Sequence, residues 1–155
     1  MLGCLPVDYN PRAATDEWSG DIGCGVQYFS QEAVVRLAPA AGIDLPDGQP
    51  AEQLKFVQDL HQQGDARPPR IFQTIGAYLG YALAQYADMY DFSHVLVLGR
   101  VTSGAGGDLI VEKATEVLRT DFPELAQKLS LHLPNEKSKR VGQAVAAASL
   151  PELRK

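Results

Sequence analysis

The sequence predicts an α/β domain in which packed helices accompany a small parallel sheet. Three observations predict it. A long apolar run beginning at Arg70 has helical spacing, short apolar runs at 95–98 and 129–133 have the character of strands, and a helical segment separates those two runs. A strand, a crossover helix and a second strand in that order indicate a parallel pair.

Composition excludes several classes of protein. Apolar residues make up 45% and charged residues 21%, and no stretch reaches the roughly 18–20 continuous apolar residues that a membrane span needs. The first residues, MLGCLPVDYN, lack a basic segment followed by an apolar run, so a cytoplasmic location is expected. The net charge is −5 and the basic residues are scattered apart from a cluster at 137–140, which argues against a direct nucleic-acid partner. Because no long apolar run is present, no membrane partner is expected either.

The length fits a single domain spanning 1–155, with a loop-rich lead-in at 1–29 and a helical and α/β core at 30–155. Proline, glycine, aspartate and asparagine are frequent in the lead-in. Cys4 and Cys24 are the two cysteines, and without a secretory signal we expect both to be reduced and buried.

The core begins with two shorter helices. Ser30 is a suitable N-cap for a helix over Gln31–Leu37, in which Glu32 and Arg36 stand four residues apart in the favourable order for an ion pair. A surface connection rich in proline and glycine follows at 39–50. A second helix then starts at Pro50 and stops at Gly64, with these residues on its apolar face: Leu54, Val57 and Leu60.

The long run should form the core helix, of about five turns or more. Its broad apolar face holds Ile71, Ile75, Tyr78, Leu79, Ala82, Leu83 and Tyr86. Gly76 and Gly80 stand four apart, which favours close packing of another backbone. Tyr78, Tyr81, Tyr86 and Tyr90 recur at near-helical spacing and indicate packing or a protein interface.

The second half alternates strands and helices. The uninterrupted apolar run at 95–98 predicts a strand covered on both faces. The next helix should start near Gly107 or Asp108 and end before Pro123, and a closing helix is expected at 141–148. Between these two helices, a second strand is expected at 129–133, where apolar and polar residues alternate.

The glycine-rich turn after the first strand matches neither common phosphate motif. Gly99 and Gly104 have the spacing of a P-loop, but Ala105 and Gly106 follow where lysine and serine or threonine belong. In the dinucleotide fingerprint, Leu109 would stand in place of the third glycine.

A more general role for this turn survives. Unpaired backbone N–H groups at the start of the next helix could face a ligand, although Asp108 would repel a phosphate. The sugar or base edge of a nucleotide is the better guest, and a turn that serves geometry alone is the alternative. His61, His94 and His132 are dispersed along the chain and predict neither a metal site nor a catalytic set.

The stretch RIFQTIGAYLGYALAQYADMYDFSHVLVLGRVTSG, with GGDLIVEKATEVL and VGQAVAAASL after it, resembles the C-terminal part of ROK proteins, a family of sugar kinases and repressors. The resemblance implies a partial actin/hexokinase-like (ribonuclease H-like) subdomain. Val97, Leu98, Gly99 and Val101 fit the family's adenosine motif V-L-G-G-G-V, whereas Arg100 replaces a glycine and would either stack on adenine or block it. The resemblance implies that the adenosine part of ATP or ADP is contacted by six residues: Gly99, Arg100, Val101, Thr102, Ser103 and Gly104.

Two further motifs of the family are degenerate in the lead-in. The sugar motif E-I-G-H-x-P would fall on 1–6, where only Gly3 and Pro6 agree. The zinc motif would fall on 22–31 and keeps Cys24 and Gly25, so no zinc is expected, because one cysteine cannot supply four donors. The family's sugar-contacting glutamate maps to Gln31, which leaves the adjacent Glu32 as a weak candidate for a residue near the sugar.

The family's phosphate loops and catalytic aspartate precede the region that this chain matches. The resemblance therefore implies that the chain alone is inactive and needs a separate N-terminal kinase lobe. The alternative is a ROK-like interaction or regulatory module that self-associates and in which Arg100 abolishes nucleotide binding; a homo-oligomer is expected. An unrelated small α/β enzyme is a third interpretation, but no acid–base or nucleophilic set accompanies the turn. The sugar is not indicated.

Overall fold

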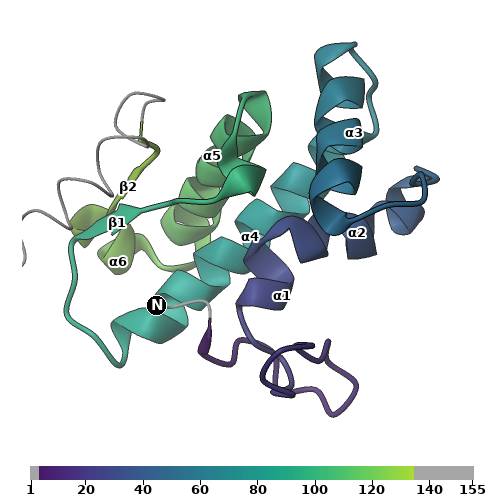
Figure 1. Ribbon diagram of the computed structural model, residues 1–155. Coiled ribbons are helices and arrows are strands. Elements are labelled where there is room, and N and C mark those ends of the chain that lie inside the picture. The colour runs from purple at the N-terminus through teal and green to yellow at the C-terminus, as the bar shows by residue number, and fades with distance from the viewer. Residues whose placement is uncertain (1–3, 135–155) are drawn as a thin grey trace, which may run out of the picture.

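A computed structural model describes residues 4–134 and has the predicted α/β character, with packed helices and a two-stranded parallel sheet. Helix α4 runs through the middle, with α5, α6 and the sheet on one side of it and α1 to α3 on the other (Figure 1). The helices are α1 (Val26–Phe29), α2 (Gln31–Leu37), α3 (Pro50–Gln62), α4 (Pro68–Ala87), α5 (Ala105–Asp121) and α6 (Pro123–Lys128). The strands are β1 (His94–Leu96) and β2 (Ser130–His132), and 3₁₀ turns occupy Pro39–Ala41 and Arg100–Thr102.

For α2, the predicted N-cap is confirmed but the predicted ion pair is not. The Ser30 hydroxyl accepts a hydrogen bond from the backbone N–H of Glu32 at 3.2 Å. The Arg36 guanidinium instead donates to the Gln27 carbonyl at 2.8 Å and lies 4.6 Å from the centre of the Tyr28 ring. The predicted pair of Glu32 and Arg36 is therefore wrong, because α1 offers Arg36 a carbonyl and an aromatic face.

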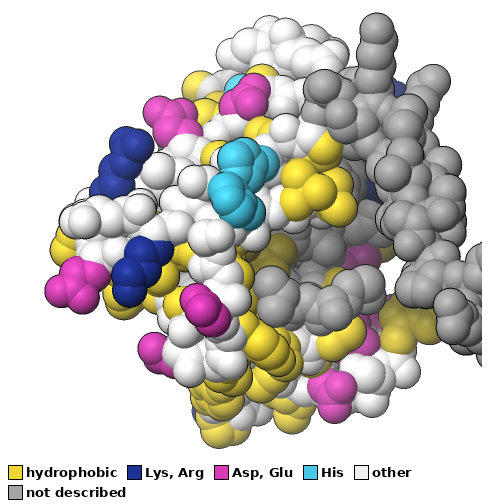
Figure 2. Space-filling model, turned by 90° about the vertical axis from the view of Figure 1, so that its left-hand side faces the viewer, with side chains coloured by type: hydrophobic (Ala, Val, Ile, Leu, Met, Phe, Trp, Pro, Cys, Tyr) yellow, Lys and Arg dark blue, Asp and Glu magenta, His cyan; other side chains and the backbone are white. Residues whose placement is uncertain are grey.

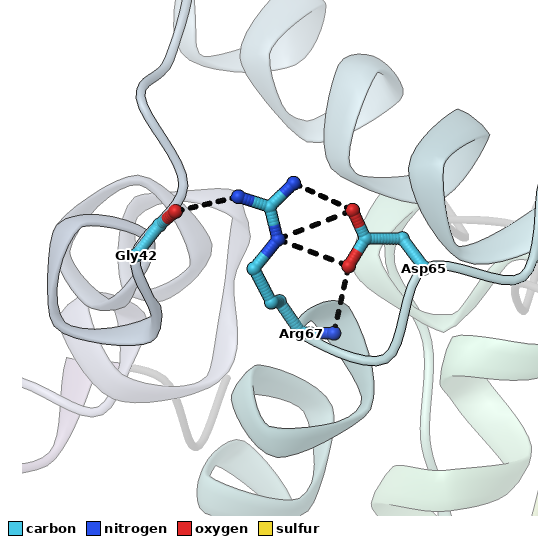
Figure 3. Close-up of polar contacts among 3 residues, drawn as sticks. All are labelled: Gly42, Asp65 and Arg67. Carbon is cyan, nitrogen blue, oxygen red and sulfur yellow. Dashed lines mark hydrogen bonds and ion pairs between the residues drawn. The ribbon is translucent and has the colours of Figure 1, made fainter.

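Helix α3 begins at Pro50 as predicted, and the turn that follows it is held by one arginine (Figure 3). Arg67 donates four hydrogen bonds to the Asp65 carboxylate. Three of them come from the Arg67 guanidinium, and the shortest is 2.6 Å from Nη2 to Oδ2. Nη1 of Arg67 donates to the Gly42 carbonyl at 2.7 Å, which joins the start of α4 to the earlier surface connection. These hydrogen bonds from Arg67 lower the pKa of Asp65 to about 2.

The predicted core helix is confirmed as α4, and its apolar face is buried except for Tyr78, which is half-buried. It packs along α5 through two glycines. A Cβ on Gly76 would lie 2.5 Å from the Ile110 carbonyl oxygen, and one on Gly80 would lie 2.8 Å from the Val117 Cβ. Both glycines therefore allow the two helices to approach more closely than side chains would permit.

Helix α5 starts at Ala105, earlier than predicted. Gly104 takes φ 69° as its N-cap, and Gly106 and Gly107 belong to the first turn instead of the preceding loop. A side chain on Gly106 would meet the Phe72 ring, and one on Gly107 would meet the Thr102 carbonyl. The glycines that indicate a turn in the sequence thus serve close packing of a helix.

The two strands pair in parallel, with Val95 opposite Leu131. The prediction that the first strand is covered on both faces is wrong for the part of the chain that the structure describes, since Leu96 is 57% and Leu98 is 60% exposed. Among residues 4–134, the packed helices therefore leave part of the apolar run at 95–98 uncovered. The predicted helix at 141–148 lies outside the described residues.

The lead-in consists mostly of turns, as predicted, with α1 as an added single helical turn. Isolated antiparallel bridges join Pro6 to Cys24 and Thr15 to Ile22. Cys24 is buried and Cys4 is exposed, so the expected burial holds for only one of the two thiols, and neither forms a disulfide. No helix between residues 4 and 134 is long and apolar enough to cross a membrane.

Candidate functional site

The glycine turn and the lead-in to α2 line one cavity with a volume of about 680 Å³. Of the residues that the sequence singled out for the site, five line this cavity: Gly99, Arg100, Val101, Thr102 and Glu32. Ser103 and Gly104, also predicted to contact a nucleotide, lie outside the lining. The structure therefore brings most of the predicted site residues together around a single hollow.

The shape of the turn is set locally. Gly99 has φ 139°, a value that other residues rarely adopt, and the Thr102 hydroxyl donates to the Gly99 carbonyl at 2.8 Å. The side-chain amide of Gln58, on α3, donates to the Arg100 carbonyl at 3.1 Å. A Cβ placed on Gly99 would meet no atom within 4 Å. These two hydrogen bonds hold the turn in place, while the space beside the Gly99 backbone stays open.

The floor of the cavity is apolar and comes mainly from α4. Ile75, Leu79, Leu83 and Tyr86 line it from that helix, and Ile110 lines it from α5. Burial raises the pKa of Tyr86 to about 12. The exposed side chains of Leu96 and Leu98 continue this apolar lining along β1 and the residues after it.

The remaining rim is a loop that no sequence motif connected with the site. It contributes Trp18, which is 97% exposed, together with Thr15, Asp16 and Glu17. Asp16 accepts hydrogen bonds from the Ser19 backbone N–H at 2.9 Å, the Ser19 hydroxyl at 3.0 Å and the Gln27 amide at 3.2 Å. The bond from the Ser19 backbone is the largest cause that lowers the pKa of Asp16, so the rim carries a carboxylate.

The charged residues of the lining are mostly acidic. Asp16, Glu17 and Glu32 face the same cavity as a single cation, Arg100, among the described residues. An acidic rim repels phosphate, while an apolar floor with an open backbone suits a flat, neutral ring.

The two degenerate motifs of the lead-in lie side by side. Pro6 bridges to Cys24, and the backbone N–H of Gly25 donates to the Leu5 carbonyl at 3.0 Å. Cys24 is 3% exposed and burial raises the pKa of its thiol, which makes it an unreactive core residue, as the sequence indicated. Met1 and Gly3 lie outside the described residues.

The histidines are not all dispersed, which corrects the sequence interpretation. His94 and His132 meet across the two strands, with 3.2 Å between Nδ1 of His94 and Nε2 of His132. His61 stands apart on α3, where its ring lies 5.8 Å from that of Phe72. Strand pairing brings together two residues that are far apart in the sequence.

No known family model matches this chain, and no curated protein matches it either. The chemistry of the cavity is therefore the basis for assigning a function.

Proposed function

We propose that this chain binds the adenosine part of ATP or ADP in the cavity beside Gly99, as the C-terminal subdomain of a ROK-type, ATP-dependent sugar kinase with an actin/hexokinase-like fold. The observation that carries the proposal is that the backbone at Gly99 opens directly onto a cavity with an apolar floor. Its volume of about 680 Å³ lies within the range of small-molecule pockets, roughly 300–1,000 Å³.

The lining suits a nucleoside better than a phosphate. Leu96 and Leu98, each more than half exposed, supply apolar contact area for a purine ring, and the missing side chain at Gly99 lets the ring approach the main chain. The carboxylates of Asp16 and Glu32 disfavour a triphosphate in the same space. Adenosine should therefore bind at least as tightly as ATP.

Catalysis is not part of the proposal for this chain alone. Phosphoryl transfer needs groups that position the γ-phosphate and stabilise its charge, and the glycine turn lacks the lysine that serves this purpose in P-loops. In the proposed kinase these groups come from a separate lobe, outside the 155 residues. The purified chain should show no kinase activity.

Isothermal titration of the chain with adenosine and with ATP tests this function. Gly99→Val places a branched side chain at the mouth of the cavity and should weaken adenosine binding at least tenfold. Gly64→Val is the matched control, because Gly64 also has a positive φ, 86°, and open space around it but does not line the cavity. The control should bind adenosine like the wild type; equal loss in both variants, or no heat with the wild type, would contradict the proposal.

A second candidate function is a self-associating interaction module, and the exposed apolar side chains favour it. Trp18, Leu96 and Leu98 surround the same cavity and are each more than half exposed. In this alternative Arg100 blocks adenine and another copy covers the apolar rim. Light scattering should then show a stable homo-oligomer that is indifferent to ATP, and Arg100→Gly should create adenosine binding that the wild type lacks.

A further inference from the structure

We propose that His94 and His132 form a surface site for a divalent transition-metal ion, with Cu²⁺ as the preferred ion. The site is separate from the cavity beside Gly99 and from the degenerate zinc motif around Cys24, and it does not depend on the proposed function.

Strand pairing fixes the placement of the two imidazoles. His94 lies opposite Ser130, and Leu96 lies opposite His132. Because side chains two residues apart on a strand share a face, both histidines project from the same face of the sheet as diagonal neighbours. The backbone bonds from Ser130 N to Ser93 O and from Val97 N to His132 O, both 2.9 Å, hold the two ends of this register.

The distance between the ring nitrogens suits a shared metal ion. Nδ1 of His94 and Nε2 of His132 are 3.2 Å apart, and the rings are inclined by 31° with 5.4 Å between their centres. With metal–nitrogen bonds of about 2.0–2.1 Å, two ligands of one ion lie about 2.9 Å apart at a right angle and about 3.4 Å apart at the tetrahedral angle. The observed separation falls between these limits.

The pair is open to solvent. Both side chains are exposed, and Figure 2 shows histidine side chains touching on this face of the molecule. Without metal, the two nitrogens share one hydrogen bond, in which one ring donates and the other accepts. With metal bound, both nitrogens become ligands, and each neutral ring keeps its proton on the other nitrogen, Nε2 of His94 and Nδ1 of His132.

The choice of ion follows from the donor set. Imidazole suits Cu²⁺, Ni²⁺ and Zn²⁺, and Cu²⁺ has the highest affinity of these for a given nitrogen site. Within residues 4–134 no third histidine, cysteine, aspartate or glutamate completes a three-ligand group. Water or an outside ligand therefore fills the other positions, which a tetragonal Cu²⁺ ion accepts.

The test is a titration of the tag-free full chain with Cu²⁺, followed by electron paramagnetic resonance. The wild type should show nitrogen hyperfine structure from two imidazoles. His94→Asn and His132→Asn should each remove one of these nitrogens and weaken Cu²⁺ binding at least tenfold. His61→Asn is the matched control, because it removes the histidine that stands apart on α3, and it should leave the spectrum and affinity unchanged.

Either of two results would overturn the site: Cu²⁺ binding and a spectrum that are the same in the wild type and both strand variants, or equal losses in all three variants. Circular dichroism checks that the variants fold. A measurement on the wild type alone does not depend on the folding of any variant. When diamagnetic Zn²⁺ is added as the probe, long-range ¹⁵N spectra should show shifted resonances for Nδ1 of His94 and Nε2 of His132 and unchanged resonances for His61. Absence of those shifts would also refute the site.

Discussion

Two regions of the molecule contain glycines among apolar residues: the contact between α4 and α5, and the turn after β1. The glycines serve opposite purposes in the two regions. A Cβ on Gly76 would lie 2.5 Å from the Ile110 carbonyl oxygen, whereas a Cβ on Gly99 would meet nothing within 4 Å. Leu118 of α5 is 2% exposed and Leu98 beside the turn is 60% exposed. Glycine and leucine therefore allow tight packing between the two helices but leave exposed surface at the turn, depending on which neighbours the fold provides.

The largest expected effect comes from the same substitution made in both regions. Leu118→Ala should lower the free energy of unfolding by about 2–5 kcal/mol, because it leaves a cavity between packed helices. Leu98→Ala should change it by no more than about 0.5 kcal/mol, since its side chain is largely in solvent. Urea denaturation of both variants checks this, and similar losses would mean that the turn is packed as tightly as the helices.

The next effect tests whether Gly76 is needed for close approach. Gly76→Val should destabilise the protein by about 1–3 kcal/mol, because the added side chain would collide with Ile110 and Lys113 on α5. Gln73→Val, on the exposed side of α4, is the control for placing a β-branched residue in this helix. Thermal unfolding of the two variants should separate them clearly; an equal change would show that α5 moves aside without cost.

A smaller effect is expected in the lead-in that borders the cavity. The Tyr28 hydroxyl donates to the Asp8 carboxylate at 2.6 Å, and this bond is the main cause that lowers the pKa of Asp8. Tyr28→Phe should cost about 1 kcal/mol at neutral pH.

The pH dependence of that loss has a definite sign. Because the folded pKa of Asp8 is lowered, its stabilisation is present above the unfolded value of about 3.9 and is lost as the pH falls through the folded value. The difference between the wild type and Tyr28→Phe should therefore shrink in acid. A difference that stays constant from pH 7 to pH 2 would place the effect in packing alone.

The smallest effect concerns the exposed arginine that holds the turn before α4. In the wild type Asp65 should titrate with a pKa of about 2, and Arg67→Gln should raise this pKa toward the ordinary value of about 3.9. Carboxyl NMR titration measures both values. An Asp65 pKa that does not change would show that Arg67 does not hold this carboxylate in solution. In either case the structure of the two glycine regions should be unaffected by the substitution.

The sequence predicted α2, α3, α4 and α5, because apolar residues recur in them at helical spacing and Ser30 and Pro50 mark two of their starts. Helices α1 and α6 were missed, since one or two turns carry too little periodicity to recognise. The start of α5 was placed late because Gly106 and Gly107 look like turn residues when their packing neighbours are unknown.

The candidate site was predicted only in part. The local pattern singled out the glycine turn at Gly99, whereas Arg100 to Thr102 and Glu32 entered as site residues through the family resemblance. Trp18 and Asp16 were missed, because a loop without periodicity gives no sign of where it packs. The contact of His94 with His132 depends on strand register; the parallel pairing was predicted, and aligning the two runs residue by residue could have revealed it.

The proposed function requires the turn at Gly99 to be an open surface that receives a nucleoside, in contrast to the tightly packed glycines of α4. Titration of the ¹⁵N-labelled chain with adenosine, followed by amide NMR, tests this requirement. We expect saturable shifts at Gly99 to Thr102 and at Glu32, with none at Lys55 on the exposed side of α3. Shifts that are absent from the turn, or no larger there than at Lys55, would contradict it.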